Sequence, residues 1–193
     1  MRFFKFCCLT LLIMIAAQGT TSAERPEVSA DEMGFDLFKG GYVLKGNVRV
    51  AMDNHGFRAK VTADEAFVSL TKQRCWADGK VKLDHEGITL GCNRAYIEWA
   101  TQTARAKGSV KFTKKSSVAI SSDTAIFNWY DKIIDFYGAI TFKAEKNLNF
   151  AAGVKLDGKT YQHVQYSVAE NKILALDKTY NAPAVRIPSI DED

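Results

Sequence analysis

A repeat of about thirty residues constrains the fold of this chain more than any other feature. From the second copy onward, equivalent residues are 29 and then 30 positions apart, as Val61, Leu90 and Ile120 show. A period of this size is typical of stacked supersecondary units, each too small to bury its own apolar face. The sequence therefore predicts a stack of similar rungs. Each rung contains a short apolar run that opens on a glycine: Gly46, Gly79, Gly108 and Gly138.

The apolar residues inside each rung recur at every second position, which is the period of a strand with one buried face. No stretch keeps the 3.6-residue period of an amphipathic helix. The three prolines, Pro26, Pro183 and Pro188, all lie outside residues 27–182, and a proline would remove a ladder hydrogen bond from a central strand. The expected fold class is all-β, a solenoid-like stack of short antiparallel strands.

The alternation shifts by one residue once in every rung, at Asp64, Asn93 and Asp123. Such a shift indicates a β-bulge or a sharp bend. Aspartate and asparagine side chains can hydrogen-bond a local turn. We therefore expect these three residues to form corners and to have no part in catalysis.

The two ends of the chain differ from the repeats. Arg2 and Lys5 precede an apolar run at residues 6–17 that is too short for the roughly 20 residues of a membrane span. With small residues before position 24, this pattern predicts a secretory signal peptide over residues 1–23 and an exported protein. We expect a flexible lead-in at 24–32, one β domain at 33–178 and a loose tail at 179–193.

Charge and motifs argue against several functions. Loss of Arg2 and Lys5 with the signal peptide lowers the formal net charge from +4 to +2, and the basic residues are scattered, unlike those of a nucleic-acid footprint. The three histidines are far apart, and no CxxC, HExxH or GxSxG motif is present. We predict neither an enzyme nor a metal or cofactor site.

Cys75 and Cys92 are the cysteines that would remain after export. An even pair in an oxidising compartment suggests a disulfide between neighbouring strands. Two buried free thiols packed as small apolar groups fit the same pattern.

Large apolar residues recur in columns on one face of the predicted strands. These columns either fill a closed core or line an apolar trough that is open at both ends and holds acyl chains by burial. Core filling alone accounts for the pattern, but the open ends of a stack favour the trough. The inward residues are Val48, Val50, Val61, Val68, Leu70, Leu83, Ile88, Leu90, Ile97, Trp99, Phe112, Val118, Ile120, Phe127, Trp129, Ile134, Phe136 and Phe142.

A stack of strands also exposes unpaired backbone groups at its first and last rungs. Exported proteins cover such edges or use them to add a strand from a partner. A head-to-tail contact of this kind builds a filament unless it closes into a ring.

The runs LKGNVRV, VTADEAFVSL and WADGKVKL, with ITLGCNRAYIEW and VAISSDTAIFNW later in the chain, make residues 33–142 resemble the OstA-like family of periplasmic lipopolysaccharide-export bridge proteins of the LptA type. The resemblance implies a V-shaped β-jellyroll in the periplasm. It also implies that lipid A acyl chains bind between the sheets, against the inward columns. Edge strands would contact an LptC-like inner-membrane partner, an LptD-like outer-membrane partner, and other copies of the chain head to tail.

Two alternatives follow from the same residues. One is a relative with the LptC role, anchored in the membrane by its N-terminus. The other is a structural or adhesive β-solenoid with a closed core.

Overall fold

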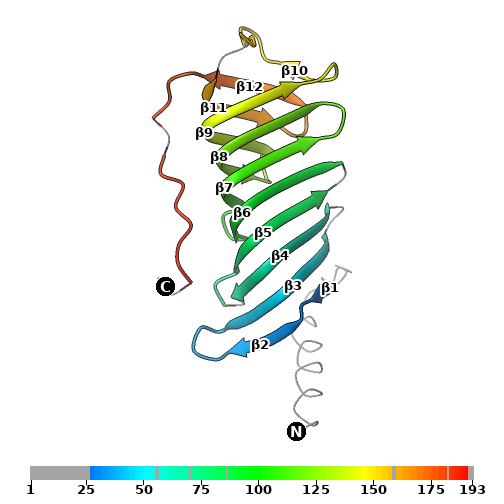
Figure 1. Ribbon diagram of the computed structural model, residues 1–193, viewed down its shortest axis with the longest axis vertical. Coiled ribbons are helices and arrows are strands. Elements are labelled where there is room, and N and C mark those ends of the chain that lie inside the picture. The colour runs from blue at the N-terminus through cyan, green and yellow to red at the C-terminus, as the bar shows by residue number, and fades with distance from the viewer. Residues whose placement is uncertain are drawn as a thin grey trace.

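The computed structural model describes residues 27–54, 57–69, 71–85, 87–157, 160–181 and 183–190. Within these ranges twelve strands form one continuous curled sheet (Figure 1). The same ranges contain no helix, and hence none long and apolar enough to cross a membrane. The expected all-β fold is confirmed, and the signal peptide expected at residues 1–23 lies outside the described residues.

The strands follow one another along the sheet almost in chain order. All neighbours pair antiparallel except β10 and β12, which pair in parallel. The strands are β1 (Glu27–Ser29), β2 (Glu32–Asp36), β3 (Gly41–Asn54), β4 (Phe57–Ser69), β5 (Arg74–His85), β6 (Ile88–Glu98), β7 (Thr103–Lys114), β8 (Val118–Asn128), β9 (Ile133–Ala144), β10 (Asn149–Phe150), β11 (Tyr161–Ser167) and β12 (Lys172–Asp177).

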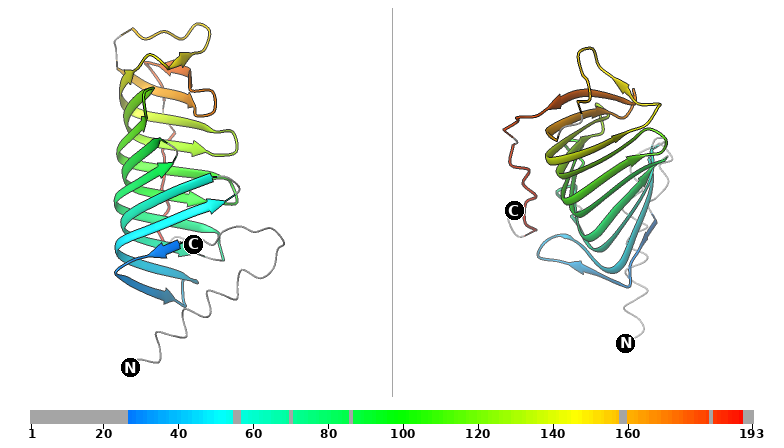
Figure 2. Two further views of the ribbon diagram at one scale, coloured as in Figure 1. Left: turned by 90° about the vertical axis from the view of Figure 1, so that its right-hand side faces the viewer. Right: turned by 45° about the horizontal axis from the view of Figure 1, so that its top comes forward.

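The central strands are longer than the sequence suggested. β3 to β9 each have 11 to 14 residues, because each passes through the predicted bend without ending there. Every long strand therefore contributes to two walls that meet at a corner (Figure 2). We call the wall with Val61, Leu90 and Ile120 wall A, and the wall with Val68, Ile97 and Phe127 wall B.

The corner is built from a glycine and an Asp or Asn side chain on the preceding strand. Gly79 has φ +74° and is followed by Lys80 at φ 47°, a left-handed conformation that glycine adopts without steric cost. A Cβ on Gly79 would lie 2.5 Å from Oδ2 of Asp64. Equivalent contacts join Gly108 to Asn93 and Gly138 to Asp123.

The register of the sheet shifts at these places, between Thr62 and Glu65 and again between Ser121 and Thr124. The backbone N–H of Ala139 donates to Asp123 Oδ2 at 3.1 Å. The predicted corner role of the Asp/Asn column is confirmed. The sequence reading missed a fourth member, Asp31, which contacts Gly46.

The main core lies on the inner face of the curl and runs from Leu44 in β3 to Ile173 in β12. A second, smaller cluster lies on the outer face of wall B. It consists of Phe67, Trp76 and Tyr96, against which Val43, Ile187 and Ile190 pack.

Two segments expected to be loose have defined contacts. Residues 27–29 form β1, in which Val28 pairs with Val50, and Glu32 opens β2. Their polar side chains suggested a lead-in, but backbone pairing to the edge of β3 does not depend on side-chain polarity. Part of the expected tail lies against the outer face, where Trp76 Nε1 donates to Pro188 O at 2.8 Å.

The cysteines are free thiols, so the disulfide interpretation is not supported. Cys75 pairs with Ile97, whereas Cys92 pairs with Val81, six residues farther along β5. Strand residues are spaced about 3.3 Å apart, and a disulfide needs Cα atoms within about 7 Å. Burial raises the pKa of Cys75 to about 12 and that of Cys92 to about 11.

Candidate functional site

The most continuous feature of the inner face is one row of apolar side chains along wall A. Cross-strand pairing links its members one to the next, and paired residues point to the same face of a sheet. Two columns that the sequence separates, one containing Leu83 and one containing Leu90, therefore interleave in a single row across seven strands. The row is Val50, Val61, Leu83, Leu90, Phe112, Ile120 and Phe142.

Wall B carries a corresponding row at a similar distance from the corner. The predicted column of Val68, Ile97 and Phe127 belongs to it. Pairing extends the row into β11 and β12, where Tyr166 and Ile173 are fully buried. Its members are Tyr42, Val68, Cys75, Ile97, Ala104, Phe127, Ile134, Tyr166 and Ile173.

The rows nearest the corner are buried over most of their length. On wall A, Val48, Val81 and Val110 are 0 to 5% exposed. On wall B the row next to the corner is made of small side chains from β4 to β8 and ends on a large one, Phe136. This alanine row is Ala66, Ala77, Ala95, Ala106 and Ala125.

Burial divides the inner face into two halves along the stack. In the open half, β3 to β6, the outer rows of both walls are only partly buried, as Val61, Leu90 and Val68 show. In the sealed half, β7 to β12, wall A residues Phe112 and Ile120 are each 1% exposed. Among the large apolar side chains of its two outer rows, only Phe127 and Phe142 are partly buried. The rows nearest the corner are buried except at Ala95, so the halves differ mainly at the mouth of the curl.

Aromatic contacts between the walls explain the sealing. The ring of Phe112 on wall A lies 5.5 Å from that of Phe136 and 5.4 Å from that of Tyr166, both on wall B. In the open half the outer row of wall A carries Leu83 and Leu90, and the row next to the corner on wall B carries alanines. Side chains of that size leave the mouth partly exposed, whereas the aromatic trio fills it.

The remaining predicted inward residues take different places. Val48, Ile134 and Phe136 belong to the buried core. Ile88 and Val118 lie farther from the corner on wall A, where each pairs with Lys114. Trp99 and Trp129 lie in the turns after β6 and β8, at the rim of wall B, and Trp99 is 37% exposed. Leu70 lies outside the described residues.

Lys114 is a charged group on this mainly apolar face, in a row that also contains His85 and Ile88. Its Nζ donates to Val168 O at 3.0 Å, and burial lowers its pKa.

A polar cluster on the outer face escaped the sequence reading. His163 is 6% exposed, and its Nδ1 lies 2.7 Å from Asp177 Oδ2 and its Nε2 3.0 Å from Asp135 Oδ1. Its ring stacks on those of Tyr137 and Tyr180 at 5.1 and 4.4 Å, and the two tyrosine rings lie 5.8 Å from each other. Burial alone would lower the pKa of His163, but the two carboxylates outweigh it and raise the pKa. No linear motif marks this cluster, because Asp135, His163 and Asp177 come from three strands.

This cluster joins β9, β11 and β12 through the hydrogen bonds of His163 to Asp135 and Asp177. Burial raises the pKa of Tyr137 to about 12, with the Asp135 charge adding to the effect. Within the described ranges, His, Cys, Asp and Glu side chains form no group of three that could hold a metal ion.

The N-terminal edge of the sheet exposes apolar side chains. β2 pairs with β3, and no described residue pairs with its other edge. Phe35 on β2 is 43% exposed, and in the following turn Leu37 is 83% and Phe38 103% exposed. An unprotected edge with exposed apolar groups is typical of a surface that pairs with another chain.

Comparison with known proteins bears on the fold. No family model matches the sequence, and no curated protein matches it. Among solved structures, the chain is similar to LptH from Pseudomonas aeruginosa, described as the LptA homologous periplasmic component of the conserved lipopolysaccharide transport device. The TM-score is 0.54 at 13% sequence identity, over 63% of this chain and 95% of that one.

The fold is LptA-like. The V-shaped β-jellyroll that the resemblance implied is thereby confirmed, and at this level of identity the likeness is one of fold.

Proposed function

We propose that this chain is a non-enzymatic periplasmic carrier of lipopolysaccharide, which holds lipid A acyl chains against the inner face of its curled sheet. The observation that supports this most is the unbroken apolar row on wall A, partly exposed from Val50 to Leu90, in a fold that is LptA-like. Burial of an acyl chain is worth about 0.8 kcal/mol per CH2 group.

The open half suits this role better than the sealed half. Its walls meet through leucine, valine and alanine, with no aromatic pair between them among the described rings. Acyl chains entering there displace few contacts. The proposed binding residues are those of the outer rows of the open half, Val50, Val61, Leu83 and Leu90 on wall A and Val68 and Ile97 on wall B, with Ile88 beside them.

The same proposal includes a bridge between the two membranes of the cell envelope. Successive molecules join by strand addition, the exposed β2 edge of one pairing with the C-terminal edge of the next. The inner faces then form one path. LptC-like and LptD-like partners would pair at the two ends of the bridge in the same way.

Photo-cross-linking from Leu90 tests the lipid site. A photoactivatable phenylalanine derivative at this position should form an adduct with lipopolysaccharide, both in cells and with the purified protein. Lys82 provides a matched control, because it lies on the adjacent strand but on the outer, exposed face. Equal adduct yields at the two positions, or none at Leu90, would contradict the proposal.

A charge at the same position gives a second test. Leu90→Glu places a carboxylate where acyl chains would lie and should abolish lipopolysaccharide binding while far-ultraviolet circular dichroism stays unchanged. Lys82→Glu should leave binding intact. A folded Leu90→Glu protein that binds lipopolysaccharide normally would argue against the site.

The sealed half favours one alternative, a structural β-solenoid with a closed core. Such a protein would carry no lipid after purification and would take none up. Native mass spectrometry with added lipopolysaccharide distinguishes the two functions, because only the carrier gains the mass of the lipid.

A further inference from the structure

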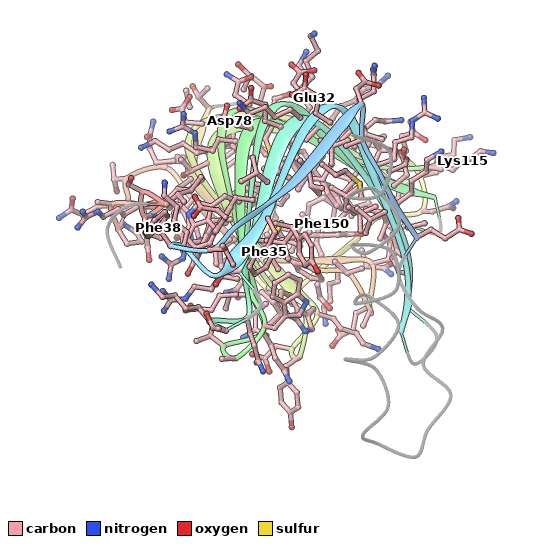
Figure 3. All side chains as sticks on the ribbon, turned by 90° about the horizontal axis from the view of Figure 1, so that it is seen from below. Glu32, Phe35, Phe38, Asp78, Lys115 and Phe150 are labelled. Carbon is pink, nitrogen blue, oxygen red and sulfur yellow. The ribbon has the colours of Figure 1, made fainter. Side chains whose placement is uncertain are left out.

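The segment between β9 and β11 closes the C-terminal end of the stack. We define residues 145–157 as the plug. Three of its apolar side chains belong to the main core: Leu148, which is 8% exposed, and Phe150 and Val154, which pack against the buried residues. Seen along the long axis from the N-terminal end, Phe150 lies between the two walls (Figure 3). The plug therefore occupies the space that an inner path would need at this end.

The plug also covers part of the last strand edge. Its β10 pairs with β12 in parallel over two residues, Asn149 with Lys172 and Phe150 with Ile173. Ala151 N donates to Ile173 O at 2.9 Å, and Asn149 N to Asn171 O at 3.1 Å. Among the described residues, none pairs with this edge of β12 beyond Ile173.

A pocket lies along the uncovered part of the edge. It is lined by residues 152–155 and Asp157 on one side and by residues 174–178 on the other, with Tyr161 at its base. Lys178 and Asp157 form an ion pair across it, and Tyr161 donates to the same aspartate. This pocket thus runs beside the unpaired backbone edge of β12, which is the arrangement that strand addition uses.

Asn171 is one of the residues that fasten the plug to the rest of the molecule. Asn171 has φ +50° and donates from Nδ2 to Asn147 O at 2.6 Å. Its Oδ1 accepts from Ser117 Oγ at 2.6 Å and from Tyr166 OH at 2.8 Å. The plug is therefore held by this Asn171 latch, by the contacts of Asp157 with Lys178 and Tyr161, and by a two-residue parallel pairing, which is short compared with the other ladders of the sheet.

We propose that the edge of β12 is the surface to which β2 of a second copy of this chain adds, and that the incoming strand displaces the plug. The two strands compete for the same backbone carbonyls, those of Asn171 and Ile173. Displacement withdraws Phe150 and Leu148 from between the walls, so assembly and the opening of the inner face are coupled. This inference rests on the head-to-tail assembly of the proposed function.

The exposed apolar residues at the other end of the stack fit this occupant. β2 is five residues long, against two for β10, and it brings Met33 and Phe35 with it. In the proposed assembly, the longer ladder of β2, with its apolar side chains, replaces the shorter ladder of β10. A second copy is thus able to cover the edge more completely than the plug does.

A reversible lock on the plug tests the proposal in the full-length chain. The variant Asn149→Cys with Lys172→Cys places two thiols on paired residues of neighbouring strands, within the usual Cα separation of a disulfide. The native thiols are poor competitors, because burial raises their pKa. The matched control, Thr62→Cys with Lys82→Cys, joins paired residues of β4 and β5 on the outer face.

Oligomers are counted by native mass spectrometry before and after reduction. We expect the oxidised plug lock to be monomeric, with at least a tenfold loss of oligomers, and reduction to restore them. The oxidised control should assemble like the unaltered chain. Normal assembly of the oxidised plug lock would overturn the inference, and so would an unaltered chain that never self-associates.

Cross-linking of lipopolysaccharide from Leu90 separates this inference from the proposed function. In the locked monomer it should persist, because Leu90 lies in the open half. If the lock leaves assembly unchanged while Leu90 still cross-links, the plug inference fails and the carrier function stands. If Leu90 does not cross-link in any form, the carrier function fails.

Weakening the Asn171 latch should increase oligomer formation, whereas the disulfide lock of the plug should decrease it. Asn171→Asp keeps an acceptor for Ser117 and Tyr166 but replaces the donor to Asn147 O with an oxygen. We expect severalfold more oligomer at a given protein concentration, with the tyrosine near-ultraviolet spectrum unchanged. Fewer oligomers in a folded Asn171→Asp protein would contradict the displacement step.

Discussion

The open and sealed halves of the inner face share one backbone design and differ in what fills it. From β3 to β9, both have the same Gly–Asp or Gly–Asn corner, the same register shift and strands of 11 to 14 residues. In the sealed half Phe112 meets Phe136 and Tyr166 across the curl. In the open half leucine and valine face the alanine row, and the mouth stays partly exposed.

This difference indicates that side-chain volume, and not strand pairing, decides whether the inner face of a curled sheet is filled or stays partly exposed. Interiors are normally packed as densely as organic crystals. A row of alanines opposite aliphatic residues does not reach that density unless the walls close or a guest enters. The sealed half supplies the rigidity that allows the open half to remain underfilled.

Truncation of one large side chain in each half should have the largest effect and tests the comparison directly. Phe112→Ala should lower the free energy of unfolding by about 3–5 kcal/mol, because a fully buried aromatic leaves a cavity. Leu90→Ala, in the same row, should cost about 1–2 kcal/mol, because burying a leucine completely is worth only about 1.5–3 kcal/mol. Urea denaturation measures both. Equal costs would mean that the two halves are equally packed.

Substitution of the corner glycines should lower the free energy of unfolding by a similar amount in the two halves. Gly79→Ala in the open half and Gly138→Ala in the sealed half both force a side chain into a left-handed backbone conformation and against an aspartate. Each should cost about 1–3 kcal/mol, measured by the same denaturation. A markedly larger cost in one half would show that the corner, and not the filling, distinguishes them.

Filling the alanine row should convert the open half toward the sealed one. Ala95 is partly exposed and shares its row with Phe136. Ala95→Phe should therefore change the unfolding free energy by less than about 1.5 kcal/mol while reducing lipopolysaccharide binding at least tenfold. Ala106→Phe is the contrast, because Ala106 is 4% exposed and overpacking there should destabilise the fold. Undiminished binding by Ala95→Phe would place the lipid elsewhere.

Most of the fold could be predicted from the thirty-residue repeat. Its period fixed which residues share a row, because a one-residue register slip would move every side chain to the other face. Val61, Leu90 and Ile120 therefore fall together as expected, and the Asp/Asn column marks the corners. Strand length was misjudged, since a bulge bends a strand without ending it.

What the sequence did not reveal arises from contacts outside the repeat. Nothing periodic links Trp76 to Pro188, or Asp135 to His163 and Asp177. The plug also departs from the rung pattern, so its place between the walls had no signal. The contrast between the halves was readable in principle, because the alanines and Phe136 occupy equivalent positions of successive rungs, but only the pairing shows which wall each side chain faces.

The smallest expected effect concerns the His163 cluster, which joins β9, β11 and β12 on the outer face of the sealed half. The only charged or titratable groups that the structure shows against His163 are Asp135, Asp177, Tyr137 and Tyr180. Burial lowers its pKa and the two carboxylates raise it, with a net increase. A histidine whose folded pKa exceeds its unfolded value of about 6.5 stabilises the fold fully below that pH. The contribution is lost as the pH rises through the folded pKa.

Amide exchange in β9, β11 and β12, corrected for intrinsic rates, should therefore become faster as the pH rises above about 6.5. Exchange in β4 should change little, because none of the described residues paired with it is a histidine. The variant His163→Gln keeps hydrogen-bonding atoms without a titrating ring and should flatten the dependence. If it retains the slope of the unaltered chain, another group fastens the sealed half, and the contrast between the halves rests on the aromatic trio alone.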